Sequence, residues 1–141
     1  MNYSIEAIFV GIYTTILYLL FSYLPIKNIY VFFFILGFFK HFFGNFLEIH
    51  TYYCNHGDAC KNKEKKISNP TSTLLFIESC LEGCLFLCLG FVLYCIPFLR
   101  KHLFVLFFII GFLLHILFEL LGIHKNFCIE RCNSLDSIYK K

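Results

Sequence analysis

Residues 111–128, GFLLHILFELLGIHKNFC, have the composition of a membrane helix but carry His115, Glu119 and His124 and run into Cys128. Residues 37–54, GFFKHFFGNFLEIHTYYC, align with this segment without a gap. The alignment pairs the first glycines, two histidines and the final cysteines of the two segments. We therefore predict that the two segments arose by duplication of one structural unit together with its polar residues.

The composition indicates an integral membrane protein. The chain has 141 residues, of which 59% are hydrophobic and 20 are Phe, whereas soluble domains are about half apolar. Four apolar runs of about 20 residues each have the length that a helix needs to cross the hydrocarbon core of a bilayer. They leave no room for a soluble domain. The first run lacks a preceding basic segment and a cleavage site, so we expect a retained span rather than a signal peptide.

The predicted fold is an all-α integral membrane protein with four transmembrane helices in an up-down bundle, formed by tandem duplication of a two-helix hairpin. Prolines at 25 and 97 follow the first and third apolar runs, and proline ends helices because it lacks an amide hydrogen. The expected helices span about 5–24, 29–49, 72–96 and 102–123. The expected divisions are repeat 1 (1–54), an aqueous Cys/Lys-rich loop (55–71), repeat 2 (72–128) and a polar tail (129–141).

The duplication extends over most of the chain. Residues 27–54 match residues 101–128 at an offset of 74, with 12 identities in 28 positions. The preceding helices match at an offset of 72, which pairs Glu6 with Glu78 and Gly11 with Gly83. Because each repeat contains an even number of spans, both repeats have the same orientation and are related by an axis along the membrane normal.

The charges of the loops predict the topology. The termini and the 50–71 loop lie on one side with eight Lys and Arg residues, and the two short turns lie on the other side with three. The positive-inside rule then places the termini and the 50–71 loop in the cytosol. Without the tail the difference shrinks to four against three.

The predicted spans contain an unusual number of ionisable residues. Such residues are costly in hydrocarbon, so they normally face the bundle interior and indicate function. Helical periodicity places them on facing stripes, near one side of the membrane. We predict one buried cluster of candidate metal ligands, with Lys40 as a further charge in a span. The candidate ligands are Glu6, His41, Glu48, Glu78, Glu82, His115 and Glu119.

Several chemistries fit this cluster. Helical bundles hold metals such as zinc or iron with Glu and His side chains, although the usual Glu-x-x-His spacing is absent here. His41 and His115 could instead be the axial ligands of a haem, which we favour less. The remaining alternatives are a proton or ion relay and polar packing that fixes helix register.

A second layer of Cys and His lies in the predicted aqueous region. Its members are His50, Cys54, His56, Cys60, His124, Cys128 and Cys132. They could bind a tetrahedral zinc, remain free thiols, or form disulfides, either Cys54–Cys60 with Cys128–Cys132 or cross-repeat pairs. On straight helices His50 and His124 would point away from the buried cluster. A shared site therefore needs bends near Glu48 and Gly122, and only the glycine favours one.

Four further cysteines, Cys80, Cys84, Cys88 and Cys95, share one face of the third helix, where we expect them to act as small packing residues.

The preferred function is a small membrane protein that binds a metal at the buried cluster, structurally or for transport. The alternatives are a scaffold without chemistry and a membrane thiol-disulfide oxidoreductase; an enzyme is the less favoured class. The expected partner is the lipid bilayer, with a homo-oligomer or a membrane protein partner left open. The modest net charge of +3 argues against nucleic-acid binding.

Overall fold

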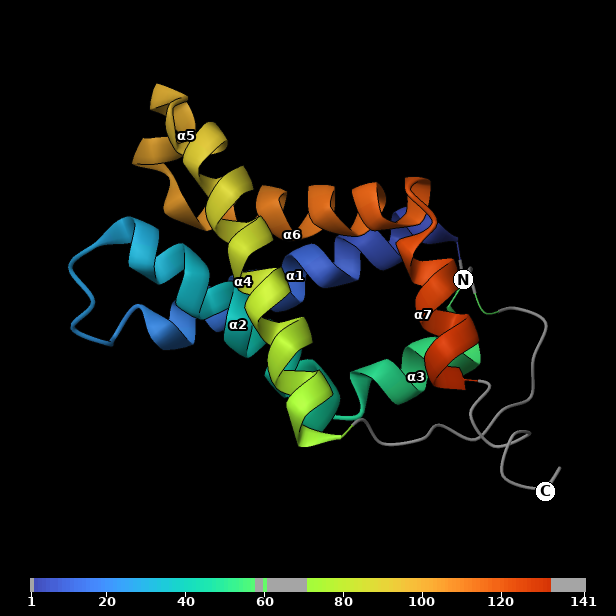
Figure 1. Cartoon of the computed structure of the whole chain (residues 1–141). Coiled ribbons are helices and arrows are strands. Elements are labelled where there is room, and N and C mark those ends of the chain that lie inside the picture. Colours follow the sequence, from blue (N-terminus) through green and yellow to red (C-terminus); the bar gives the residue numbers. More distant parts are fainter. Residues whose placement is uncertain (1, 58–59, 61–70, 133–141) are drawn as a thin grey trace, which may run out of the picture.

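The computed structural model describes residues 2–57, 60 and 71–132, and within them the chain forms helices joined by turns, without a strand (Figure 1). Four helices are long and apolar enough to cross a membrane, which confirms the predicted all-α class and four candidate spans. They are α1 (Tyr3–Phe21), α2 (Ile29–Phe46), α4 (Ser72–Tyr94) and α6 (Leu103–Leu120). The shorter helices are α3 (Ile49–His56), α5 (Pro97–Lys101) and α7 (Ile123–Cys132).

The helix ends follow local sequence signals. The side chain of Asn28 accepts a hydrogen bond from the Tyr30 amide at the start of α2, and Thr71 caps α4 through the Leu74 amide. Pro97 opens the short helix α5, where the sequence predicted only a turn. Helices α2 and α6 end three residues earlier than expected, because the backbone turns before α3 and α7.

The long helices pack as two antiparallel pairs, α1 with α6 and α2 with α4, whereas the contacts between the consecutive helices α1 and α2 are few. Glycines permit close approach in both pairs. A Cβ on Gly11 would meet the Phe108 ring at 2.8 Å, and one on Gly83 would meet the Phe34 carbonyl oxygen at 2.9 Å. In Figure 1, α1 and α6 lie side by side while α4 crosses them obliquely with α2.

Aromatic rings join the two pairs in the core. Phe33 of α2 and Phe107 of α6 are fully buried, with ring centroids 5.4 Å apart. Tyr18 of α1 stacks on Phe107 at 4.6 Å. Large buried aromatic surfaces contribute strongly to packing, so this cluster anchors α1, α2 and α6 against one another.

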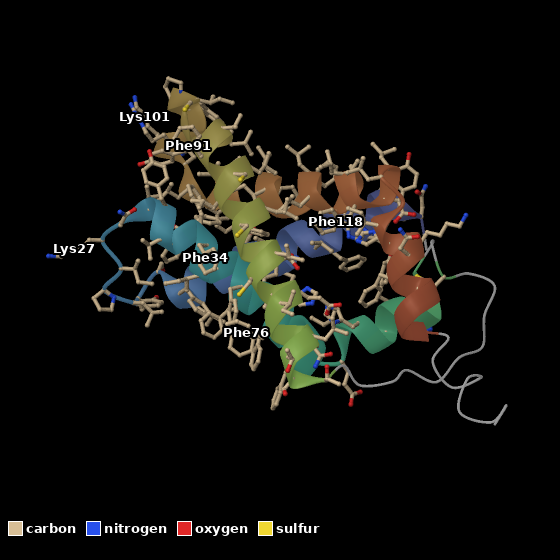
Figure 2. All side chains as sticks on the ribbon, viewed as in Figure 1. Lys27, Phe34, Phe76, Phe91, Lys101 and Phe118 are labelled. Carbon is tan, nitrogen blue, oxygen red and sulfur yellow. A yellow bond between two sulfur atoms is a disulfide. The ribbon has the colours of Figure 1, made fainter. Side chains whose placement is uncertain are left out.

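The outer surface is apolar. Phe9, Leu20 and Phe76 are more than half exposed, and Figure 2 shows Phe76 and Phe91 on the outside of the helices. Soluble monomers rarely expose continuous apolar surface of this kind, whereas hydrocarbon tails match it. Lys27 and Lys101 lie at the end of the molecule away from α3 and α7.

The cysteines of α4 are free thiols, and three of them are exposed on the outer surface. Cys80 is half-buried, whereas Cys84, Cys88 and Cys95 are exposed. These cysteines therefore do not form the contact with α2, since the face of α4 that meets α2 is formed by Glu82, Gly83 and neighbouring residues instead.

Candidate metal centre

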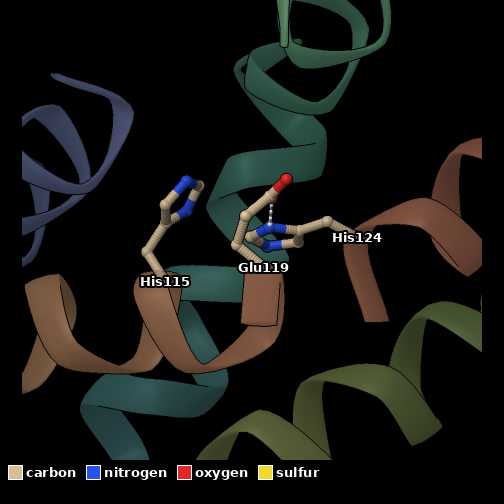
Figure 3. A group of neighbouring side chains, drawn as sticks. All are labelled: His115, Glu119 and His124. Atoms are coloured by element: carbon tan, nitrogen blue, oxygen red, sulfur yellow. Dashed lines mark hydrogen bonds and ion pairs between the residues drawn. The ribbon is translucent and has the colours of Figure 1, made fainter. Parts of the chain in front are cut away.

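A bend after α6 brings three potential metal ligands together (Figure 3). Helix α6 ends at Leu120, Gly122 adopts a left-handed backbone with φ 71°, and α7 begins at Ile123. Glycine adopts this conformation without the steric cost that a side chain would impose. The bend turns α7 back across the end of α6, so that His124 faces the residues from which a straight helix would have separated it.

His115, Glu119 and His124 form a compact group, since one ligand atom of each lies within 4.8 Å of the other two. His115 and Glu119 are one turn apart on α6 and therefore share a face. The Nδ1 atom of His124 lies 2.8 Å from the Glu119 carboxylate, and the rings of His115 and His124 are 4.5 Å apart. His115 is buried, and Glu119 and His124 are half-buried.

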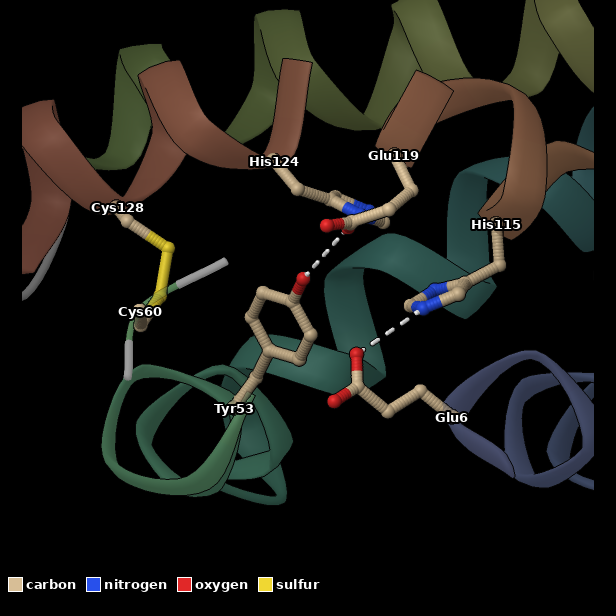
Figure 4. The surroundings of a disulfide bond; sticks show 7 residues. All are labelled: Glu6, Tyr53, Cys60, His115, Glu119, His124 and Cys128. Carbon is tan, nitrogen blue, oxygen red and sulfur yellow. Dashed lines mark hydrogen bonds and ion pairs between the residues drawn. A yellow bond between two sulfur atoms is a disulfide. The ribbon is translucent and has the colours of Figure 1, made fainter. Parts of the chain in front are cut away.

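Two further side chains complete this group (Figure 4). Glu6 of α1 is 2% exposed, and its carboxylate lies 3.4 Å from Nε2 of His115. The hydroxyl of Tyr53, from α3, donates a hydrogen bond of 3.3 Å to Glu119. We call these five residues, Glu6, Tyr53, His115, Glu119 and His124, the second-repeat cluster. The sequence did not single out Tyr53, whose counterpart at the 74-residue offset is Phe127.

The environment of His124 favours its neutral form. Burial lowers the pKa of His124 below its usual value, although the neighbouring Glu119 carboxylate opposes this shift. A neutral imidazole is the form that ligates a metal. At neutral pH His124 is therefore uncharged, and a ring nitrogen can bind a metal ion without first losing a proton.

Residues of α2, α3 and α4 form a separate polar group around His41. His41 contacts the Glu82 carboxylate through Nδ1 at 2.8 Å and the Glu78 carboxylate through Nε2 at 3.3 Å. Lys40 forms an ion pair with Glu82, and the His50 ring lies 4.8 Å from the His41 ring. We call these residues, Lys40, His41, His50, Glu78 and Glu82, the first-repeat cluster. The single shared cluster that the sequence predicted is thus divided into two.

Glu48 belongs to neither cluster. It is exposed and has a left-handed backbone, φ 56°, between α2 and α3. The chain therefore bends in both repeats, whereas the sequence favoured a bend only at Gly122. The bend after Glu48 turns His50 toward His41, so the predicted separation between the buried cluster and the histidines of the aqueous layer is wrong.

The cysteine layer contains a disulfide between Cys60 and Cys128 of α7. Cys60 bonds to Cys128, and both residues are about 95% buried beside Tyr53 and Phe127. Their sulfurs therefore cannot supply a zinc site. His56 is exposed and stacks on Tyr52. The side chains of Cys54 and Cys132 lie outside the described part of the structure.

The second-repeat cluster has the chemistry of a three-ligand metal centre. Two imidazoles and a carboxylate are a common protein ligand set for zinc with an open coordination position, and the same set suits non-haem iron. No protein-family model, curated protein or solved structure matches the chain. The fold and this group together define an all-helical protein with four candidate membrane spans and a potential His/Glu metal centre.

Proposed function

We propose that the protein is a small integral membrane protein that binds one divalent transition-metal ion, zinc or iron, through His115, Glu119 and His124. The observation that carries this proposal is the approach of the three ligand atoms to within 4.8 Å of one another. Two of these residues come from α6 and the third from α7, across the left-handed bend at Gly122. A metal ion bound there would take the place of the hydrogen bond between Nδ1 of His124 and Glu119, and the neutral imidazole would carry its proton on Nε2.

The surroundings support this assignment. A metal-bound imidazole usually donates its other nitrogen to a carboxylate, which fixes the ring, and Glu6 lies 3.4 Å from His115. Tyr53 holds Glu119 by a hydrogen bond. The cluster lies at the end of α6, where the span meets the aqueous layer, so an ion can enter without crossing the bilayer. This position suits a structural ion or the entry site of a transport path.

Metal analysis of the purified full-length chain tests the proposal. After dialysis in detergent against zinc and then buffer, we expect one zinc per chain, and none in the His124→Ala variant. His102→Ala is the control, because His102 is exposed between α5 and α6, and it should retain one zinc. Wild-type protein that binds neither zinc nor iron would refute the proposal.

We also propose that the chain is a duplicated hairpin whose spans alternate in direction across the membrane. The contacts support this origin, because equivalent pairs recur at the 72- and 74-residue offsets. Gly11 packs on Phe108 as Gly83 packs on Phe34. His115 meets Glu6 as His41 meets Glu78.

We assign the side of the membrane on which α3 and α7 lie to an oxidising compartment. Disulfides persist in such compartments and are rare in the cytosol, so the Cys60–Cys128 bond favours this orientation. The loop charges favour the opposite orientation, but the difference in the number of Lys and Arg residues between the two sides depends on the tail. We expect an antibody to reach a C-terminal tag in intact cells, before permeabilisation. Access only after permeabilisation would reverse the assignment.

The disulfide also favours a second candidate function, a membrane scaffold whose aqueous layer cross-links the two repeats. The bond is buried, which suits a structural role better than exchange with external thiols. A scaffold would keep its thermal stability in a metal chelator, whereas the metal-binding protein should lose stability there.

A further inference from the structure

One of the three ligands of the candidate metal centre lies on a short helix. His115 and Glu119 belong to the long helix α6, whereas His124 is the second residue of α7, which has 10 residues. Helices shorter than about 12–15 residues are marginal in water unless tertiary contacts support them. At the junction of the two helices, a Cβ placed on Gly122 would meet nothing within 4 Å. The position of His124 therefore depends on the contacts that hold α7.

The disulfide fastens α7 to the end of α3. Cys128 follows His124 by one helical turn and therefore lies on the same face of α7. Its partner Cys60 lies just beyond α3, where the Cys60 amide donates a hydrogen bond of 3.1 Å to the Gly57 carbonyl oxygen. The Gly57 amide in turn donates to the carbonyl oxygen of Tyr53 at 2.7 Å. The covalent bond thus joins two short helices that both contribute side chains to the second-repeat cluster.

Tyr53 connects the disulfide to the ligands. It packs against the two bonded cysteines, and its hydroxyl donates to Glu119 at 3.3 Å. The centroid of its ring lies 5.1 Å from that of the His124 ring. Figure 4 shows Tyr53 between the disulfide and the ligand side chains. The bond therefore supports His124 through α7 and Glu119 through Tyr53.

We propose that the Cys60–Cys128 disulfide is a positioning element of the metal centre, so that the affinity for the metal depends on this bond. The bond supplies no ligand atom. It keeps α7 docked, so that His124 faces Glu119 before an ion arrives. A site that is competent in only a fraction of the molecules binds with an affinity reduced by that fraction. This inference rests on the proposed metal binding, and it makes the site complete only in a compartment where disulfides persist.

The first test is the zinc affinity of the full-length chain without the bond. The double variant Cys60→Ser with Cys128→Ser is used, because a lone Cys128 thiol would itself be a zinc ligand. We expect its zinc affinity in detergent to decrease at least about tenfold, which follows if α7 is docked in a tenth of the molecules or fewer.

The control is a variant that loses stability elsewhere. Leu36 is fully buried in the apolar core on α2, so Leu36→Ala should lower the melting temperature through lost packing. Below that temperature it should keep the wild-type zinc affinity. Equal affinities of the wild type and the double variant would overturn this inference alone, as would an equal loss in Leu36→Ala. A wild type that binds no zinc would overturn the proposed function together with it.

A reciprocal measurement on the wild type decides the matter if the double variant does not fold. A buried disulfide meets an external reductant only after local opening, and zinc bound to the closed form reduces the open fraction by the factor 1 + [Zn]/Kd. Zinc at 100 times its dissociation constant should therefore slow the reduction of Cys60–Cys128 by a water-soluble phosphine by up to about 100-fold. Mass spectrometry after alkylation measures the two thiols formed, as water supplies the oxygen of the phosphine oxide.

Zinc should leave the rate of this reduction unchanged in His124→Ala, which lacks the ligand on α7. An equal rate of reduction in wild-type protein with and without bound zinc would refute the inference.

Discussion

Glu48 and Gly122, 74 residues apart, have the same left-handed backbone, with φ of 56° and 71°. Each follows a membrane-length helix and precedes a short helix that folds back toward it. The two bends turn His50 and His124 toward His41 and His115, respectively. One backbone conformation thus creates both polar clusters, although only one of the two residues that adopt it is glycine.

The bends give matched predictions for stability. A non-glycine residue in the left-handed region costs about 1 kcal/mol or more. Glu48→Gly should therefore stabilise the protein by up to about 1 kcal/mol, after the greater flexibility of glycine in the unfolded chain is deducted. Gly122→Ala should destabilise it by about 1 kcal/mol, because a Cβ there has open space and meets only the backbone cost. Denaturation in mixed detergent micelles measures both, and a destabilised Glu48→Gly would contradict the assignment.

Stability should decrease below neutral pH through His124. Burial lowers its pKa in the folded protein, whereas the unfolded chain binds this proton near the ordinary value of about 6.5. The unfolded state therefore binds more protons as the pH falls from about 6.5 toward the lower folded pKa, and stability is lost in that window. Above it both states are neutral and the effect disappears.

The variant His124→Gln should make the melting temperature less dependent on pH between 7.5 and 5.0. The comparison with wild type isolates this residue from the other groups that titrate, including Glu119 and His115, which face it. His102→Gln, at an exposed position, should keep the wild-type slope. Equal slopes in all three proteins would show that His124 does not contribute.

Glu6 should act as a positioning residue for the metal. Carboxylates that hold a ligating imidazole typically increase metal affinity by about 10- to 100-fold. Glu6→Gln should therefore weaken zinc binding by about that factor without removing a ligand. Glu78→Gln is the equivalent change in the first-repeat cluster and should leave zinc affinity unchanged. Competition with a fluorescent chelator measures both, and equal losses in the two variants would indicate a general effect on folding.

The disulfide should contribute substantially to stability. Cys60 and Cys128 are 68 positions apart, and a cross-link over a long loop typically adds about 2–4 kcal/mol. In the absence of reductant, Cys60→Ser should have a lower melting temperature than the wild type, because its unfolded chain is no longer constrained by the cross-link. Cys88→Ser, which changes an exposed free thiol, should behave as the wild type. Equal melting temperatures of Cys60→Ser and the wild type would show that this bond does not stabilise the native state.

The candidate site could be predicted in part. The sequence predicts ligand candidates at His115, Glu119 and His124, because charged and imidazole groups stand out in apolar segments. The sequence groups His115 with Glu119 but assigns His124 to a separate layer, since helical periodicity locates side chains only along a straight axis and the axis changes at Gly122. The sequence places the charge of Lys40 in a span, but its ion pair with Glu82 of α4 depends on helix packing.

The sequence by itself determined the all-helical class and the four membrane-length helices, because both depend on local composition and on the length that a bilayer requires. The tertiary structure alone decided that α1 packs with α6 and α2 with α4, that Cys60 bonds to Cys128, and that two clusters form instead of one. The physical reason is that these features join residues far apart in sequence. They depend on how glycines fit against aromatic rings across helices, and on two backbone torsions at Glu48 and Gly122.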